Sequence, residues 1–115
     1  MDSIIFSLER QRRLLEQVLD LAVGGLDMLE GGRLDDTERL LLMRAERMQE
    51  FVMAEAKVAA KMSDIKNDPT LDAGSFAELD NLNRQIITLV DYIIAVDERA
   101  EELGELLAAR ITARA

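Results

Sequence analysis

The chain has 115 residues, of which 49% are hydrophobic and 32% charged, with a net charge of -9 and no cysteine or histidine. This size and balance predict one folded domain, 1-115, without a membrane span. Because thiol and imidazole groups are missing and acidic charge repels phosphate, we expect no catalytic residues, no metal site, no cofactor and no nucleic-acid partner.

The N-terminal stretch MDSIIFSLERQRR places its basic cluster, Arg10, Arg12 and Arg13, after the apolar residues. A signal peptide has the opposite order, so we expect cytoplasmic residence. The cluster is the only local basic patch in the sequence, and we interpret it as a solvated helix face.

Turn-forming residues at Gly31-Gly32 and in the segment 67–74 divide the chain into three periodic segments. The first predicts a helix over about 3–30, with Gly24-Gly25 as a weak point at which a bend is plausible. Its apolar positions are Ile4, Leu8, Leu15, Val18, Ala22, Leu26 and Leu29.

The second segment predicts a helix over about 36–65, with Asp35 and Glu38 placed as a capping box. Its apolar face is predicted to be centred on Leu41, Met48 and Met62, with Ala45, Phe51, Val52, Val58 and Ala59 at its flanks.

The third segment predicts a helix over about 76–112, which opens at Ser75 with Glu78 completing a capping box. Apolar residues recur along it at alternating steps of three and four: Leu79, Leu82, Ile86, Leu89, Ile93, Val96, Ala100, Leu103 and Leu107. This period of 3.5 residues predicts a long helix that packs lengthwise against other helices.

Short connections between long helices predict an all-α fold, an antiparallel up-down-up bundle of three long helices with coiled-coil-like packing. Folding the chain at its two turns places residues at the same level when their numbers sum to about 65 for the first pair of helices and about 141 for the second pair. Three levels follow from these sums: Met48 with Val18 and Ile93, Leu41 with Leu26 and Ala100, and Met62 with Leu79.

Glu55 interrupts the apolar face of the second helix, level with Gln11 and Arg12 on the first helix and Gln85 on the third. Since a buried, unpaired carboxylate is costly, we predict a structural polar layer in which Glu55 meets Arg12 or Gln11. In the alternative, the face rotates so that Glu55 points outward and Ala56 fills the core.

Two apolar surfaces exceed what three helices need for their own packing. The third helix, about 55 Å long against about 45 Å for the second, should project past the first turn. A flank row beside its main stripe adds a broad face that is either buried in the bundle, which we favour, or forms a groove for a partner helix. The predicted partner-binding residues are Ile87, Val90 and Ile94 in the row and Leu103, Leu106, Leu107 and Ile111 at the end.

The C-terminal surface has alternatives of its own. The tail frays, or Gly104 breaks the helix and folds the tail back onto the bundle. An all-α enzyme such as chorismate mutase would need Arg and Lys side chains that converge inside the bundle. Because Arg12, Arg44 and Arg84 are scattered, we do not expect an enzyme.

Residues 29–40, LEGGRLDDTERL, and residues 44–48, RAERM, resemble the first helical hairpin of flagellar type III export chaperones of the FliT/FlgN type. Residues 93–99, IIAVDER, are similar to a late helix of the FliT type, and residues 82–84, LNR, are similar to a stretch of the FlgN type. The resemblance spans most of the chain.

This resemblance implies a small cytoplasmic chaperone with two protein partners, a flagellar cap or hook-associated protein and the export apparatus. Such a chaperone binds a helical segment of its client and holds it for export. The FliT type has a fourth helix over the client site, for which this sequence leaves only the tail after Gly104, so a FlgN-like form matches nearly as well. The competing hypothesis is a non-catalytic helical adaptor that forms a homodimer or larger homo-oligomer through its third helix.

Overall fold

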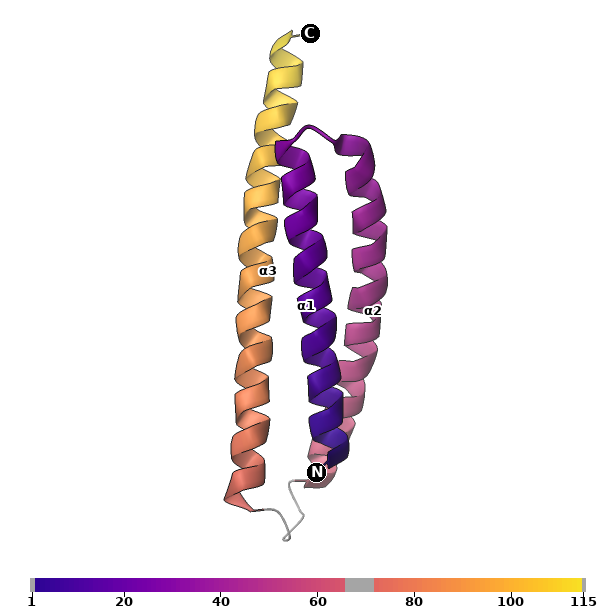
Figure 1. Cartoon of the computed structure of the whole chain (residues 1–115), viewed down its shortest axis with the longest axis vertical. Coiled ribbons are helices and arrows are strands. Elements are labelled where there is room, and N and C mark those ends of the chain that lie inside the picture. The colour runs from indigo at the N-terminus through magenta and orange to yellow at the C-terminus, as the bar shows by residue number, and fades with distance from the viewer. Residues whose placement is uncertain (1, 66–71, 115) are drawn as a thin grey trace.

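In a computed structural model the chain forms three long antiparallel helices, α1 (Asp2–Glu30), α2 (Leu34–Ile65) and α3 (Ala73–Arg114) (Figure 1). The structure describes residues 2–65 and 72–114, except for the side chains of Asp2, Leu34, Asp35, Ile111 and Arg114. The bundle is elongated, with Cα extents of 68 × 21 × 17 Å. The predicted all-α bundle of three helices is confirmed, and each helix begins and ends close to its predicted bounds.

The turn after α1 explains why this helix ends at Glu30. Gly32 has a φ of 72°, a left-handed conformation that glycine adopts without steric cost. Its N–H donates to the carbonyl of Leu29 at 3.1 Å, and the N–H of Arg33 donates to the carbonyl of Met28 at 2.8 Å. These two hydrogen bonds form a Schellman motif, which satisfies the last carbonyl groups of α1.

The N-termini of α2 and α3 both differ from the predicted caps. Asp35 lies inside α2, and its side chain is outside the described set. At α3, the Oδ1 atom of Asp72 accepts the N–H of Ser75 at 2.8 Å. The predicted capping box of Ser75 and Glu78 is therefore wrong, because an acidic side chain one turn earlier caps the helix. The backbone hydrogen bond from Ser75 also lowers the pKa of Asp72.

The helix α1 lies between α3 and α2, as Figure 1 shows. Within the described parts of the chain, Cα atoms of α1 come within 8 Å of both other helices, whereas no Cα atom of α2 comes within 8 Å of α3. The backbone of α3 therefore packs closely on α1 alone, and α2 and α3 meet only through their side chains. The buried apolar residues of α1 are Ile4, Leu8, Leu14, Leu15, Val18 and Ala22.

The face that α2 buries differs from the predicted one. Phe51 and Ala54 are buried, whereas Leu41 and Val52 are 61% and 57% exposed. Apolar residues cover a wide arc of this helix, so their spacing alone does not select the part that meets α1. Much of the predicted face lies beside the contact with α1 rather than in it.

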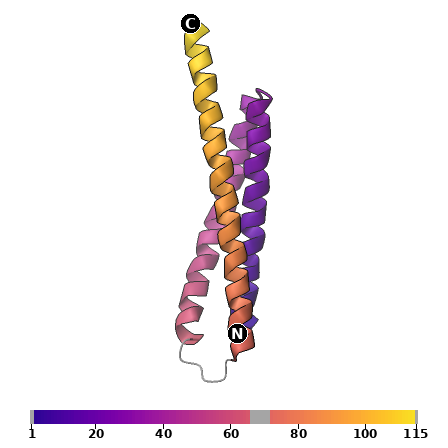
Figure 2. The same ribbon diagram turned by 90° about the vertical axis from the view of Figure 1, so that its left-hand side faces the viewer.

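The helix α3 has 42 residues against 29 for α1 and 32 for α2, so its C-terminal turns project past the α1–α2 turn. Figures 1 and 2 show this projection from two directions. The helix runs without interruption through Gly104 to Arg114. The alternative in which Gly104 breaks the helix and the tail folds back is therefore wrong.

Candidate helix-binding groove between the second and third helices

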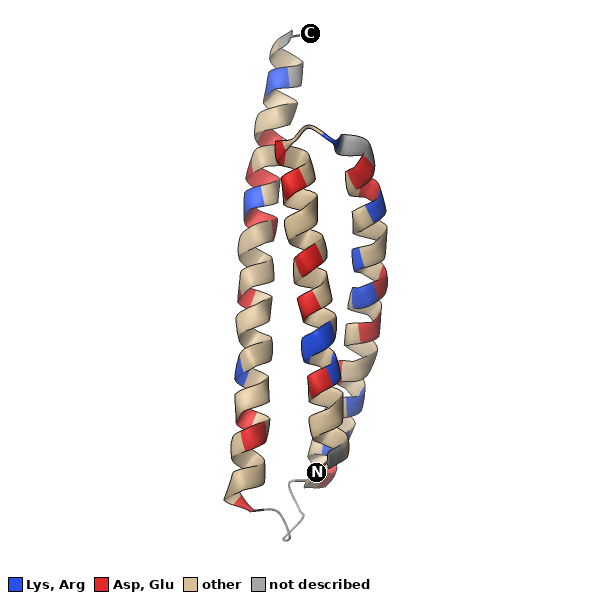
Figure 3. Ribbon diagram, viewed as in Figure 1, with Lys and Arg blue, Asp and Glu red and all other residues tan. Residues whose placement is uncertain are grey.

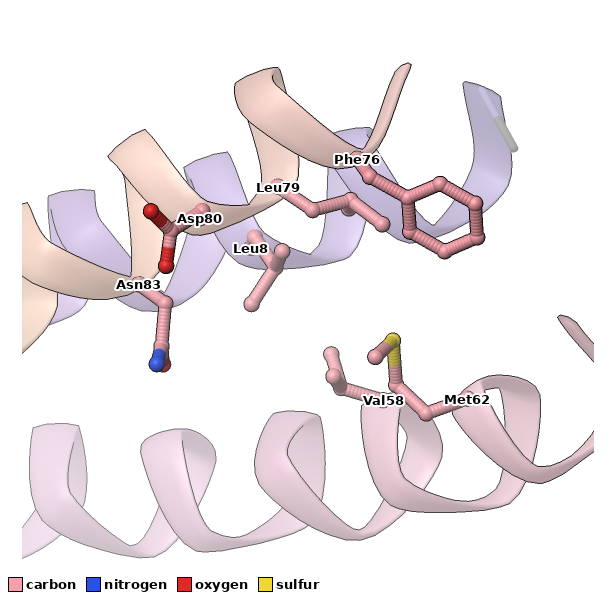
Figure 4. A pocket seen from close by; sticks show the side chains of 7 residues that line it. All are labelled: Leu8, Val58, Met62, Phe76, Leu79, Asp80 and Asn83. Atoms are coloured by element: carbon pink, nitrogen blue, oxygen red, sulfur yellow. The ribbon is translucent and has the colours of Figure 1, made fainter. Parts of the chain in front are cut away.

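Two cavities border the described parts of both α2 and α3, and α1 forms their floor. One has a volume of about 320 Å³, and Figure 4 shows Val58 and Met62 of α2 pointing toward α3 across it. Its lining residues are Leu8, Val58, Met62, Phe76, Leu79, Asp80 and Asn83. The other, about 170 Å³, lies toward the α1–α2 turn and includes Leu26, Leu41 and Ala100 in its lining. Residues that were predicted to share a level thus line the same cavity: Met62 and Leu79 in the first, and Leu26, Leu41 and Ala100 in the second.

A single row of α2 connects the two cavities. Leu41 and Met62, which line opposite ends, are three heptads apart, so the residues between them at alternating steps of four and three lie on the same side of the helix. This row comprises Leu41, Ala45, Met48, Val52, Glu55, Ala59 and Met62. It is the stripe that the sequence placed near the core, and it forms one wall of an open groove.

The flank row of α3 forms the facing wall. Asn83 lines the first cavity and Asp97 the second, and the residues between them at steps of three and four are Ile87, Val90 and Ile94. Val90 packs partly against the core, but Ile87 and Ile94 are 52% and 49% exposed. Our preference for burial of this row is therefore wrong for two of its three residues. We call the space between this row and the α2 row the α2–α3 groove.

An ion pair crosses the groove near the α1–α2 turn. Arg44 Nη1 donates to Asp97 Oδ1 at 2.6 Å, and Nη2 donates to Oδ2 at 2.6 Å. The hydrogen bond with Asp97 raises the pKa of Arg44. Sequence reasoning missed this pair, although the two residue numbers sum to the 141 that defines a shared level. Long side chains thus link α2 and α3 where their backbones stay apart.

Among the charged side chains in and beside the two groove rows, the carboxylates outnumber the cations. Arg44 is paired with Asp97, and Arg84 Nη2 lies 2.7 Å from Asp80 Oδ2. Glu55 in the α2 row and Asp91 and Glu98 beside the α3 row are exposed and form no ion pair with the described residues. Figure 3 shows that acidic positions outnumber basic ones along α3.

The opposite side of α2 carries the contrasting charge. A shallow surface between α1 and α2 surrounds the exposed ring of Phe6, with basic residues from both helices at its border. These are Arg10, Arg13, Arg47, Lys57 and Lys61. Two members of the predicted basic cluster thus join residues distant in sequence, while Arg12 turns toward α3.

Polar side chains do meet at the predicted level of the bundle, but Glu55 is not among them. Glu55 is exposed, and no described side chain binds it, so it does not meet Arg12 or Gln11. Instead Arg12 Nη1 donates to Gln85 Oε1 on α3 at 2.8 Å, and Gln11 is buried beside it on α1. Ala56 is also exposed, so the alternative in which it fills the core is wrong as well.

The predicted C-terminal surface is only partly exposed. Leu106 is 54% exposed, whereas Leu103 and Leu107 are half-buried. The prediction for Ile111 concerns a side chain outside the described set. The projecting end therefore offers one strongly exposed leucine, compared with several exposed apolar residues on the two walls of the groove.

Comparisons with protein-family models, curated proteins and solved structures found no match for this chain. Among residues 2–65 and 72–114, no helix is long and apolar enough to cross a membrane. No cluster of three or more potential metal-binding residues of the acidic, cysteine or histidine type occurs in these ranges. The apolar groove between α2 and α3 is therefore the candidate functional site.

Proposed function

We propose that the chain is a non-catalytic, cytoplasmic flagellar secretion chaperone. It binds a helical segment of a filament-cap or hook-associated subunit in the α2–α3 groove and holds that segment for export. The observation that carries this proposal is the pair of exposed apolar rows, with Leu41 and Val52 on one wall and Ile87 and Ile94 on the other. A helix between these rows would supply the fourth element of a bundle and bury its own apolar face.

The flagellar part of the proposal is supported by the motifs at residues 29–48 and 93–99. The second of these motifs contributes Ile94 and Asp97 to the groove wall. The same sequence stretch therefore supports both the family resemblance and the location of the binding surface.

Co-expression with the flagellar cap and hook-associated subunits of the same genome tests this function. We expect one subunit to copurify with the wild-type chain and to be lost with Ile94→Asp, because a carboxylate in the groove would be desolvated by an apolar helix. Tyr92→Asp is the matched control, since Tyr92 is also strongly exposed on α3 but lies outside the groove row. Circular dichroism should show the same helicity for both variants.

Two outcomes contradict the proposal. In one, no flagellar subunit copurifies with the wild-type chain. In the other, Ile94→Asp and Tyr92→Asp reduce copurification equally although both variants remain folded, which would place the client elsewhere on the surface.

A second candidate function is an adaptor that homo-oligomerises through α3. The projecting end of that helix favours it, because Leu106 is 54% exposed there. Size-exclusion chromatography with light scattering should then give a dimer or larger assembly for the wild-type chain and a monomer for Leu106→Asp. A monomeric wild-type chain at micromolar concentration would exclude the adaptor and leave the chaperone.

A further inference from the structure

We infer that the α2–α3 groove selects a basic amphipathic helix, in which Lys and Arg side chains flank the apolar face. This inference rests on the proposed function, because it specifies the ligand chemistry of the same groove. It goes further in that the walls discriminate between helices that have equal apolar faces and opposite flanking charge.

The charged side chains at the groove differ in whether they have an ion-pair partner. The one guanidinium group that lines either groove cavity in the described parts of the chain, that of Arg44, is already paired with Asp97. The neighbouring Arg84, which lines a cavity between α1 and α3, is paired with Asp80. Glu55, Asp91 and Glu98 have no ion-pair partner among the described residues. A ligand with acidic flanks would therefore meet like charge along both walls, whereas a ligand with basic flanks would meet free carboxylates.

These carboxylates lie at helical spacing from the exposed apolar residues. On α2, Glu55 lies one helical turn from Val52, and on α3, Asp91 and Glu98 each follow a groove isoleucine, Ile87 or Ile94, by four residues. Each carboxylate thus stands next to an exposed apolar side chain. An amphipathic helix presents its charges at the same distance from its apolar stripe, so both kinds of contact can form together.

The length of the groove sets the length of a suitable probe peptide. The groove extends from the Arg44–Asp97 ion pair to the cavity at Met62. The 18 residue-to-residue steps from Arg44 to Met62 on α2 correspond to about 27 Å of helix, or five turns. The cavity of about 320 Å³ at the far end, lined mainly by apolar side chains, has room for an apolar side chain of the ligand.

Two fluorescent peptides of about 18 residues test the inference in anisotropy titrations with the full chain. They share one leucine-rich helical face and differ only in their flanks, which are lysine in one peptide and glutamate in the other. We expect the lysine-flanked peptide to bind at least tenfold more tightly in low salt, with the difference shrinking as salt screens the charges.

Charge-reversed chains separate the groove from the overall acidity of the protein. The double variant Asp91→Lys/Glu98→Lys should abolish the preference for the lysine-flanked peptide. Glu9→Lys/Glu46→Lys makes the same change in net charge at α1 and α2 positions outside the groove, and it should retain the preference. Equal loss in both double variants would show non-specific attraction and overturn the inference.

The remaining outcomes separate this inference from the proposed function. If both peptides bind with equal affinity and Ile94→Asp abolishes binding of both, the groove takes helices without charge selection and only the inference fails. If neither peptide binds, or if Ile94→Asp leaves binding unchanged, the groove is not a helix-binding site and the proposed function fails with it.

Discussion

The buried face of α1 and the α2–α3 groove contain similar apolar residues, which are covered on α1 and exposed in the groove. Val18 on α1 is 0% exposed, whereas Val52 on α2 is 57% exposed. The difference arises because α1 packs against two helices, while α2 and α3 each pack on α1 and leave their facing rows uncovered. An apolar row at heptad spacing therefore predicts that a helix has a face suited to packing, but not that its own chain covers that face.

Substitution of the two valines tests this difference most strongly. Val18→Asp places a carboxylate in the core and should destabilise the fold by about 4 kcal/mol or more. The same change at Val52 should cost no more than about 0.5 kcal/mol, because this side chain already faces solvent. Urea unfolding followed by circular dichroism measures both values. Equal destabilisation would show that the groove is closed in solution.

Glycine substitutions near the α1–α2 turn test the C-terminal end of the packed helix α1. Gly32→Ala should destabilise by about 1 kcal/mol, because its φ of 72° is unfavourable for a side chain. Gly25→Ala should stabilise by about 0.5–1 kcal/mol, since a Cβ atom there would meet no atom within 4 Å. Thermal unfolding should shift in opposite directions for the two variants. A loss of stability in both would contradict the open space beside Gly25.

A double-mutant cycle on Arg44 and Asp97 measures how firmly the two walls are joined. This bidentate pair is partly exposed, so we expect a coupling free energy of only about 0.5–1 kcal/mol. The helices should stay in place without the pair because both are held by α1. A coupling of several kcal/mol would instead indicate that the ion pair holds the bundle together.

The smallest expected effect is at the start of α3. The hydrogen bond from Ser75 keeps the folded pKa of Asp72 below its usual value of 3.8, so the carboxylate stabilises the fold above that pH. This contribution disappears as pH falls through the lowered folded pKa. The melting temperature of Asp72→Ala should therefore lie below that of the wild type at pH 7, and the gap should close in acid. A gap that persists at pH 2 would contradict a role for the ionised cap.

The rule that residues at one level have numbers with a constant sum held, because antiparallel helices joined by short turns advance by equal rises in opposite directions. It placed Leu41 with Leu26 and Met62 with Leu79, pairs that the structure brings together around the two cavities. It also placed Arg12 at the level of Gln85, although Glu55 was taken as the partner. The error was one of rotation about the axis of α2, because level and direction are independent coordinates of a helical residue.

The row of Ile87, Val90 and Ile94 could be found from the sequence as an apolar surplus on α3. Its assignment to a groove required the spacing between α2 and α3, which depends on how both helices seat on α1. The sequence also did not predict that unpaired carboxylates of two helices lie at one groove, since Glu55 on α2 is distant in sequence from Asp91 and Glu98 on α3.

The amino-acid pattern alone predicts three helices, about where each begins and ends, and which residues share a level. These properties follow from local turn chemistry and from a hydrophobic period that each segment carries alone. The side of α2 that meets α1, and the separation of the α2 and α3 backbones, depend on the assembled bundle. The physical reason is that apolar residues span a wide arc of α2, so several rotations bury comparable area, and the choice among them depends on the packing of all three helices together.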